Sequence, residues 1–534
     1  MHQHRRAGDL HRDGQDRPPR RGAVVRARRA TDLTGEHDPG RGAGTIPAEG
    51  PRVTRTTADP RLDAIRRTLE RAGQGHLLAF YDALDGPARA RLLAAIDSIE
   101  PARLADLARV AIGADSAATI PDDLAPAPYY PRDPASPVRP WDRDRFRAAG
   151  EAIIRAGQAA VFTVAGGQGT RLGFDGPKGC HPAGPVTGKP LFQVLAEQVR
   201  AASARFGVAI PWRIMTSPLN HDATTAFFDT HGSFGLAPGQ VGFFRQGVLP
   251  TFDARTGKVL LADKDAPATN PDGHGGSLRA LHRSGALDEL AGLGVEHLFY
   301  TQIDNPLVRA VDPIFLGLHA RADDSSAEMS SKMIAKADPA EKVGVFCTAG
   351  GRLRIIEYSD LPPALAEARD DTGELRFKAG SPAIHVIALG FIRRLNEAPG
   401  GFALPLHRAL KRVPHVDPTT GERVDPAEPN AVKLETFVFD ALPMCERSVV
   451  LETDRFEFAP IKNATGADSP ETCARLQTAR NAAWLEAAGV RVPRNKAGEP
   501  DCVIEISPLT ALEADDLAGR DLPAAIEPGA RVAL

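Results

Sequence analysis

AAVFTVAGGQGTRLGFDGPKG, residues 159–179, places a short apolar run directly before a loop that holds six glycines, one arginine and one lysine. The apolar run predicts a buried strand over residues 159–165. Glycine lets the backbone approach a ligand and loop N–H groups bind phosphate, so the arginine and lysine indicate an anionic ligand. KPLFQVLAEQVRAASARF, residues 189–206, keeps apolar residues on one helical face. The segment therefore predicts a strand, a phosphate-binding loop and a helix.

Two common phosphate loops do not fit the spacing of these glycines. The Walker A pattern requires Gly-Lys-Ser/Thr, whereas Lys178 lies between Pro177 and Gly179. The dinucleotide pattern GxGxxG fails as well, because Gly173 comes one residue too late. The glycines alone are weak evidence for a phosphate site, because some glycine loops of this kind are only turns.

Beyond this loop, short apolar runs alternate with helical patterns. The sequence predicts strands over 211–217 and 295–304, a helix over 220–232 and a hairpin over 343–361. This alternation is typical of an α/β domain. We expect a doubly wound, mostly parallel, Rossmann-like sheet.

The composition of the chain changes along its length. Residues 1–58 are basic and poor in large apolar side chains, and predict a disordered tail. Residues 59–135 predict a helical region that ends near Gly113 and a Pro-rich linker. Residues 136–462 form the expected central domain, which contains the glycine loop, and residues 463–534 a small C-terminal lobe.

The overall composition excludes several classes of protein. The chain has 534 residues, 42% of them apolar, and a net charge of −3, which argues against a nucleic-acid binder. It has no apolar run of the length of a membrane span, so no membrane association is expected. Its five cysteines form no CxxC pattern and predict free thiols and a cytoplasmic location.

The longer string GGQGTRLGFDGPKG resembles the GGxGTRLG…PKG fingerprint of sugar-nucleotide pyrophosphorylases. PWRIMTS, FFRQGVLP, PDGHGG, QIDN, GVFCTAGGRLRIIEYSD, KLETFVFD and FAPIKNA follow in the order found in the UDP-N-acetylglucosamine pyrophosphorylase branch. The resemblance covers roughly residues 60 to 534. It implies transfer of a uridylyl group from UTP to a sugar 1-phosphate by in-line attack, with release of pyrophosphate.

The resemblance also implies a role for individual residues, each with a structural alternative. Arg171, Lys178 and Lys433 would act on the phosphates as catalytic residues, although an isolated lysine is usually a surface residue. The implied nucleotide-binding residues are Gly166, Gly167, Gly169, Gln246, Gly273, His274 and Lys462. Asp304, which follows an apolar strand, would hold Mg²⁺ through oxygen ligation, or would cap a turn.

Sugar choice is the least determined part of the resemblance. Glu357 and Gly344 match residues that contact an N-acetylated sugar in the family. His274 replaces the usual asparagine of DGNGG, and Ser381 stands where the branch has the first asparagine of GNIANH. Each lost amide removes a hydrogen bond worth about 0.5–1.5 kcal/mol. N-acetylglucosamine 1-phosphate is the leading acceptor, and glucose 1-phosphate or a broad range of sugars is the alternative.

Two other classes of protein remain possible from the sequence. A glycosyltransferase would carry a DxD motif, whereas this chain has QIDN. A non-catalytic nucleotide-sugar sensor would have lost the phosphate-binding lysines, which are present here.

Overall fold

The computed structural model describes residues 60–113 and 120–534. The chain divides into two units, residues 1–57 and 58–534. The predicted disordered tail, residues 1–58, lies outside the described residues.

Three helices begin the described chain: α1 (Pro60–Arg71), α2 (Gly86–Ser98) and α3 (Leu104–Ile112). The helical pattern after α1 breaks at Gly73, whose φ of 71° is left-handed. Gly113 follows α3 as its C-cap, so the predicted end of the helical region is confirmed.

An eleven-stranded mixed sheet forms the centre of the molecule. Its parallel part has the order β10-β2-β3-β4, with β10 at His297–Gln302, β2 at Ala159–Val164, β3 at Trp212–Thr216 and β4 at Val241–Arg245. The remaining strands are β15 (His385–Ala388), β11 (Met329–Ala335), β14 (Ala379–Gly380), β12 (Val345–Ala349), β1 (Ala125–Pro126), β13 (Arg352–Ile356) and β20 (Val450–Glu452).

The prediction of a mostly parallel sheet is wrong for this second part. Its strands pair antiparallel, except that β20 runs parallel to β11. The predicted hairpin is β12 and β13, joined at Gly350 and Gly351, both of which have positive φ. A tight turn of this kind reverses the chain and forces antiparallel pairing.

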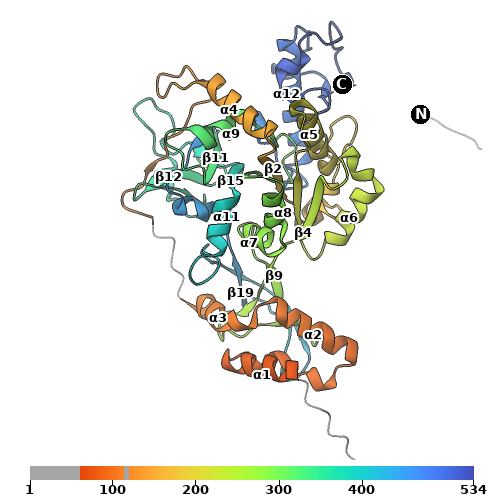
Figure 1. Cartoon of the computed structure of the whole chain (residues 1–534), viewed down its shortest axis with the longest axis vertical. Coiled ribbons are helices and arrows are strands. Elements are labelled where there is room, and N and C mark those ends of the chain that lie inside the picture. The colour runs from red at the N-terminus through yellow and green to blue at the C-terminus, as the bar shows by residue number, and fades with distance from the viewer. Residues whose placement is uncertain (1–59, 114–119) are drawn as a thin grey trace, which may run out of the picture. The chain divides into compact units, whose positions relative to one another are not determined.

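Helices cover both faces of the parallel strands, because successive side chains of a strand point to opposite faces. Val161 of β2 belongs to one buried core together with α4, α5 and α9, whereas Phe162 belongs to another with α7, α8 and α11. Figure 1 shows these helices around β2 and β4. The helices of the central domain, of which α10 packs near β12 and not on the parallel strands, are α4 (Arg143–Arg155), α5 (Leu191–Phe206), α6 (His221–Thr230), α7 (Gly276–Arg283), α8 (Ala286–Gly292), α9 (Pro313–Arg321), α10 (Pro363–Ala366) and α11 (Leu389–Asn396).

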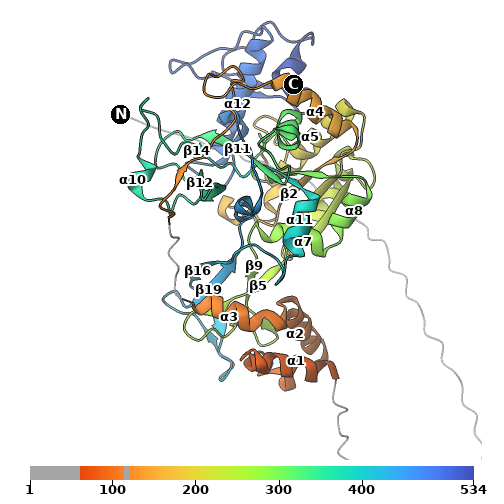
Figure 2. The ribbon, with the colours of Figure 1, turned by 60° about the vertical axis from the view of Figure 1, so that its left-hand side comes forward.

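Two insertions into the central domain form a separate β region, which we call the β extension (residues 248–271 and 407–435). Its strands are β5 (Val248–Pro250), β6 (Phe252–Asp253), β7 (Leu261–Asp263), β8 (Ala266–Pro267), β9 (Thr269–Pro271), β16 (His407–Lys411), β17 (His415–Val416), β18 (Arg423–Val424) and β19 (Ala431–Glu435). It shares one buried core with α1, α2 and α3. Figures 1 and 2 show these helices below β9 and β19.

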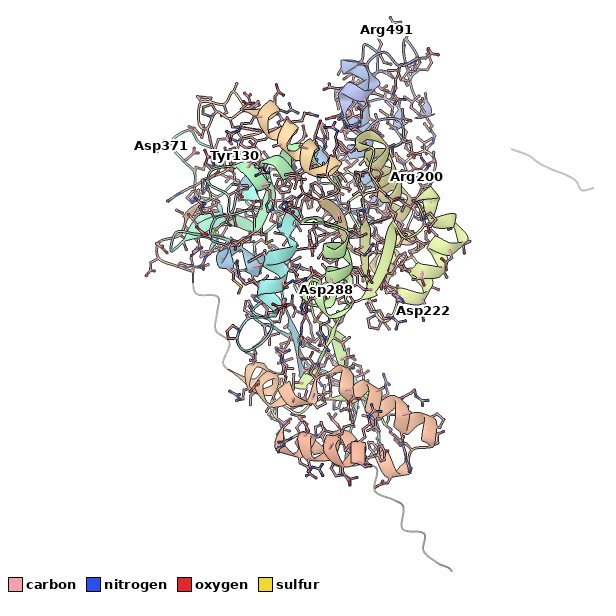
Figure 3. All side chains as sticks on the ribbon, in the orientation of Figure 1. Tyr130, Arg200, Asp222, Asp288, Asp371 and Arg491 are labelled. Carbon is pink, nitrogen blue, oxygen red and sulfur yellow. The ribbon has the colours of Figure 1, made fainter. Side chains whose placement is uncertain are left out.

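The predicted linker is partly structured. Its strand β1 pairs with β12. The hydroxyl of Tyr130, labelled in Figure 3, donates a 2.6 Å hydrogen bond to Asp324. The linker therefore contributes to the central sheet.

The C-terminal segment has a buried core of its own, formed by α12 (Pro470–Ala487), β21 (Val503–Glu505) and β22 (Arg531–Ala533). The carboxylate of Glu505 attaches it to the central domain by accepting hydrogen bonds from Val186 and Thr187. The domain boundaries predicted from the sequence stay predictions.

The predictions about the cysteines and about membrane-spanning segments concern the whole chain. All five cysteines are free. Within residues 60–113 and 120–534, no helix is long and apolar enough to cross a membrane.

Candidate active site

The glycine loop after β2 folds back on itself. The carbonyl of Gly167 accepts a 3.0 Å hydrogen bond from the N–H of Lys178, and the Gly169 N–H donates to the Gly176 carbonyl at 2.9 Å. A β-carbon on Gly167 would lie 3.9 Å from Cε of Lys178. The loop therefore brings the lysine side chain over the glycines that precede it.

Lys178 meets Asp304 at the edge of the sheet. The parallel strands β2 and β10 are neighbours, so the loops that follow them emerge side by side. The Lys178 ammonium lies 3.4 Å from Oδ2 of Asp304, and both side chains are largely buried. The next strand along the chain, β3, lies on one side of β2, and β10 lies on the other side. This change of direction in the strand order is a topological switch point. Open α/β sheets bind ligands at such points.

Gln246 follows β4 and lies over the start of the glycine loop. Its amide nitrogen donates to the Gly273 carbonyl at 2.9 Å and to Oδ1 of Asp272 at 3.1 Å. A β-carbon on Gly166 would lie only 2.8 Å from the Gln246 oxygen. Burial raises the pKa of Asp272 to about 7. Gly166 is thus needed for the close approach of Gln246.

Six of the predicted site residues line one cavity of about 230 Å³: His274, Asp304, Gly344, Glu357, Ser381 and Lys462. They come from six separate segments between β9 and α12. The sequence reasoning missed other lining residues, among them Gln302, Asn305, Lys342, Pro382, Phe439 and Phe458. Gln302 and Asn305 stand in the quoted QIDN motif, and Phe439 and Phe458 stand in the quoted KLETFVFD and FAPIKNA motifs, so these four were open to prediction.

Gly344, Glu357 and Ser381 form one wall of this cavity. The Ser381 N–H donates to the Gly344 carbonyl at 2.8 Å, and a β-carbon on Gly344 would lie 3.3 Å from Oε1 of Glu357. Burial raises the pKa of Glu357, and the charge of Asp360 adds to this effect. Ala383 in the same wall has a φ of 57°, a strained conformation for a residue with a β-carbon. The wall therefore presents the Glu357 carboxylate beside a glycine backbone that is too crowded for a side chain.

The amino-acid sequence of the chain matches that of a known protein family. A sequence profile of the family described as UTP-glucose-1-phosphate uridylyltransferase matches residues 143–496. The chain belongs to this family. The resemblance expected from the sequence motifs is thereby confirmed.

Individual members of the family are similar over most of the chain. Human UDP-N-acetylhexosamine pyrophosphorylase-like protein 1 is 37% identical over 485 residues, which cover 85% of this chain and 93% of that protein. The UDP-N-acetylglucosamine pyrophosphorylase of Saccharomyces cerevisiae is 35% identical over 438 residues, 79% of this chain and 90% of that one. A crystal structure of the uridine diphosphate N-acetylglucosamine pyrophosphorylase of Trypanosoma brucei superposes with a TM-score of 0.73 at 26% identity, covering 88% and 98% of the two chains.

His274 lines the cavity and also packs against the segment that follows β19. Its ring stacks on Phe437 at 5.2 Å, and Nδ1 accepts a hydrogen bond from the Val438 N–H at 3.1 Å. Burial lowers the pKa of His274 to about 4, so the ring is neutral at physiological pH. Because Nδ1 is an acceptor, the proton is on Nε2. The ring of His407 also stacks on Phe437, at 4.4 Å, and His407 was not predicted from the sequence.

The glycines around His274 have a packing role. A β-carbon on Gly273 would lie 2.2 Å from the Thr436 carbonyl oxygen, and one on Gly275 would lie 2.7 Å from the Phe437 backbone. Gly273 has a φ of 82° as well. Close packing against the backbone is a sufficient reason for glycine at both positions, whether or not a ligand binds there. Nucleotide binding by Gly273 therefore stays a prediction.

Three predicted cationic residues differ in their placement. Lys462 lines the cavity, and its ammonium lies 3.6 Å from Asp468. Lys433 is in β19 of the β extension, between two residues of the core shared with the helices, and does not line the cavity. Arg171 is exposed in the glycine loop and is also outside the cavity lining. The structure therefore brings together Lys178, Asp304 and Lys462, but neither Arg171 nor Lys433.

The donor set around Asp304 fits a magnesium ion that substrate phosphates also hold. Among the described residues, no group of three or more His, Cys, Asp or Glu side chains is arranged to bind a metal. Mg²⁺ is commonly held by one or two carboxylates together with substrate phosphates. The buried Asp304 carboxylate lines the cavity and can be such a ligand.

Proposed function

We propose that this protein is a Mg²⁺-dependent uridylyltransferase that forms a UDP-sugar and pyrophosphate from UTP and a sugar 1-phosphate. N-acetylglucosamine 1-phosphate is the leading acceptor. The observation that carries the proposal is the position of Lys178 and Asp304 at the sheet edge, with Asp304, Gly344 and Glu357 lining one cavity. We also infer that the β10-β2-β3-β4 part acts as a Rossmann-like nucleotide half, and that the protein is cytoplasmic.

The proposed chemistry requires positioning and charge neutralisation. An oxygen of the sugar 1-phosphate attacks the α-phosphorus of UTP in line, the new P–O bond forms, and the bond to pyrophosphate breaks. Lys178 balances charge on the UTP phosphates, and Lys462 of the cavity lining does so as well. Bound Mg²⁺ would supply a Lewis acid that neutralises phosphate charge, held by Asp304. Arg171 and Lys433 are proposed to join on substrate binding.

Gln246 is proposed to recognise uracil. Its amide nitrogen is held by Asp272 and Gly273, which leaves the oxygen above Gly166. Gly167 and Gly169 of the same loop would face the nucleotide. A fixed amide of this kind can match one edge of a base by hydrogen bonding.

The sugar wall favours an N-acetylated sugar. Glu357 can accept hydrogen bonds from sugar hydroxyls, and Gly344 brings bare backbone next to it, where a β-carbon would be crowded. The relatives named for N-acetylglucosamine support this choice. His274 and Ser381, both in the cavity lining, keep glucose 1-phosphate or a broad range of sugars as the second candidate.

The test is pyrophosphate release from UTP and Mg²⁺ with N-acetylglucosamine 1-phosphate, N-acetylgalactosamine 1-phosphate and glucose 1-phosphate at equal concentration. We expect faster turnover of the N-acetyl sugars. In Gly344→Ala, the new β-carbon meets Ile355 at 2.7 Å, and we expect kcat/KM to fall more for the N-acetyl sugars than for glucose 1-phosphate. Gly292→Ala, where a β-carbon meets no atom within 4 Å, is the matched control.

Faster turnover of glucose 1-phosphate would instead support the second candidate, an enzyme for glucose 1-phosphate or a broad range of sugars. Absence of turnover with all three sugars would instead favour the non-catalytic sensor.

A further inference from the structure

A second and larger cavity, of about 540 Å³, lies behind the wall of the site cavity. The segment Pro306–Arg309 lines it on one side, and α12 with residues 505–515 lines it on the other. Val308 lines both cavities. The volume is within the range of small-molecule sites in proteins.

Most of the charged side chains in the interior of this cavity are paired. Asp312 and Glu457 line it, and both carboxylates lie 2.6 Å from the ammonium of Lys332, which is fully buried outside the lining. Arg309 pairs with Glu513 at 3.1 Å. These contacts leave little charge available for a ligand.

Arg480 on α12 is different. Its guanidinium donates to the neutral amide oxygen of Asn481 at 3.2 and 3.1 Å and lies 4.5 Å above the ring of Trp484. Within the described part of the chain, no carboxylate forms an ion pair with it. Burial lowers the pKa of Arg480 to about 10, because the charge of Glu457 only partly offsets the loss of hydration. At neutral pH it is a cation in the cavity wall that has no carboxylate in ion-pair contact among the described residues.

The rest of the wall suits a flat apolar group. Aromatic side chains from three segments line it, namely Trp141, Phe456 and Trp484, together with Ile314 and Leu512. Aromatic rings bury large areas of apolar ligand surface.

We propose that this cavity binds a small aromatic oxyanion, with its phosphate or carboxylate on Arg480 and its ring against Trp484. A charged guanidinium forms strong bidentate hydrogen bonds with such a group. The prediction that this cavity binds such a ligand does not rest on the proposed function.

Residues between this cavity and the candidate active site form hydrogen bonds that join the two. The Glu457 carbonyl accepts a 2.6 Å hydrogen bond from the Asn305 side chain. The Ile461 N–H donates to the Asp304 carbonyl at 2.9 Å. A ligand that displaces Glu457 would therefore move Asp304 relative to Lys462. The predicted effect of the ligand on the active site rests on the proposed function. When the ligand is bound, we expect a change in kcat that excess UTP does not reverse.

Tryptophan fluorescence tests this predicted binding directly, because two of the three tryptophans line the cavity. The full chain is titrated with phenyl phosphate, with benzoate, and with benzyl alcohol as a neutral probe. We expect saturable quenching by one or both anions and none by benzyl alcohol. Arg480→Gln should weaken anion binding about 10-fold or more, whereas Arg480→Lys should retain part of it. Arg475→Gln, in the same helix and exposed, is the matched control.

Further variants distinguish this site from the active site. Lys178→Ala should still bind phenyl phosphate with unchanged affinity, whatever the result of the activity assay. Ala514→Trp should fill the cavity and abolish quenching even if Arg480→Gln does not fold. Equal binding by Arg480→Gln and the wild type, equal quenching by benzyl alcohol, or loss of binding in Lys178→Ala would overturn the proposal.

Discussion

At the scale of single residues, the contact between Lys178 and Asp304 is the main determinant of the candidate chemistry. The two residues are 126 positions apart, and their side chains approach to 3.4 Å. A compact ammonium in a partly buried position neutralises phosphate charge more effectively than one in open water. The proposed substrates carry several phosphate groups, so removing this charge should affect turnover more than folding.

Lys178→Ala is expected to lower kcat by about 100-fold or more, in line with the removal of a single charge-stabilising group from an active site. Pyrophosphate release at saturating UTP measures the effect. Lys258→Ala, an exposed lysine in the β extension, is the control and should keep wild-type turnover. Unchanged turnover in Lys178→Ala would contradict the assignment of the site.

At the scale of elements, the PDGHGG turn and the segment after β19 hold each other in place. The Gly275 N–H donates to the Thr436 carbonyl at 2.9 Å, and the ring of His274 stacks on Phe437. His407 extends the stack, and its hydrogen bond to Asp440 raises the pKa of that histidine. One side of the site cavity thus depends on contacts between elements of the β extension and the turn before α7.

Gly275→Ala tests this packing. Its β-carbon would meet the Phe437 backbone at 2.7 Å, so the turn has to move. We expect a melting temperature lower by about 2 °C or more, since overpacking typically costs about 1–3 kcal/mol, together with a higher KM for the substrates. Calorimetry and steady-state kinetics give the two values, and Gly292→Ala should change neither. A wild-type melting temperature in Gly275→Ala would show that the contact carries no strain.

At the scale of the whole described chain, Glu100 joins the N-terminal helices to α7. Its carboxylate accepts hydrogen bonds from Arg279 at 2.5 and 2.6 Å and pairs with Arg103 and Arg283. Burial opposes ionisation of Glu100, but Arg279 and Arg103 outweigh it and lower its pKa to about 2. A lowered carboxyl pKa stabilises the folded state above the unfolded pKa, and this contribution is lost as the pH falls.

Glu100→Gln should therefore lower the melting temperature at pH 7 by about 1–3 °C. The difference from the wild type should shrink between pH 4.5 and pH 2, where the wild-type carboxyl becomes protonated. Differential scanning calorimetry at several pH values provides the measurement. Asp106→Asn removes an exposed ion pair with Arg109 in the same helical region, and should have little effect at any pH. A pH-independent difference for Glu100→Gln would refute the electrostatic explanation.

Some features of the site were predictable because they are local. The strand and loop over residues 159–179 follow from an apolar run and from glycines that tolerate left-handed or crowded positions. Asp304 was predictable because the residue after a buried parallel strand emerges at the edge of the sheet. Lys433 was placed by motif alone, and the structure locates it in the β extension, away from the cavity.

The sequence by itself determined the local elements, the glycine loop and the family, since each depends on residues close together along the chain. Only the tertiary structure decided that the sheet is mixed, because an apolar run specifies burial of a strand but not the direction of its partner. Only the tertiary structure showed that the N-terminal helices share a core with residues 248–271 and 407–435. It alone revealed the stack of His274 on Phe437 and the unpaired Arg480, because such contacts depend on long-range packing that no local pattern encodes.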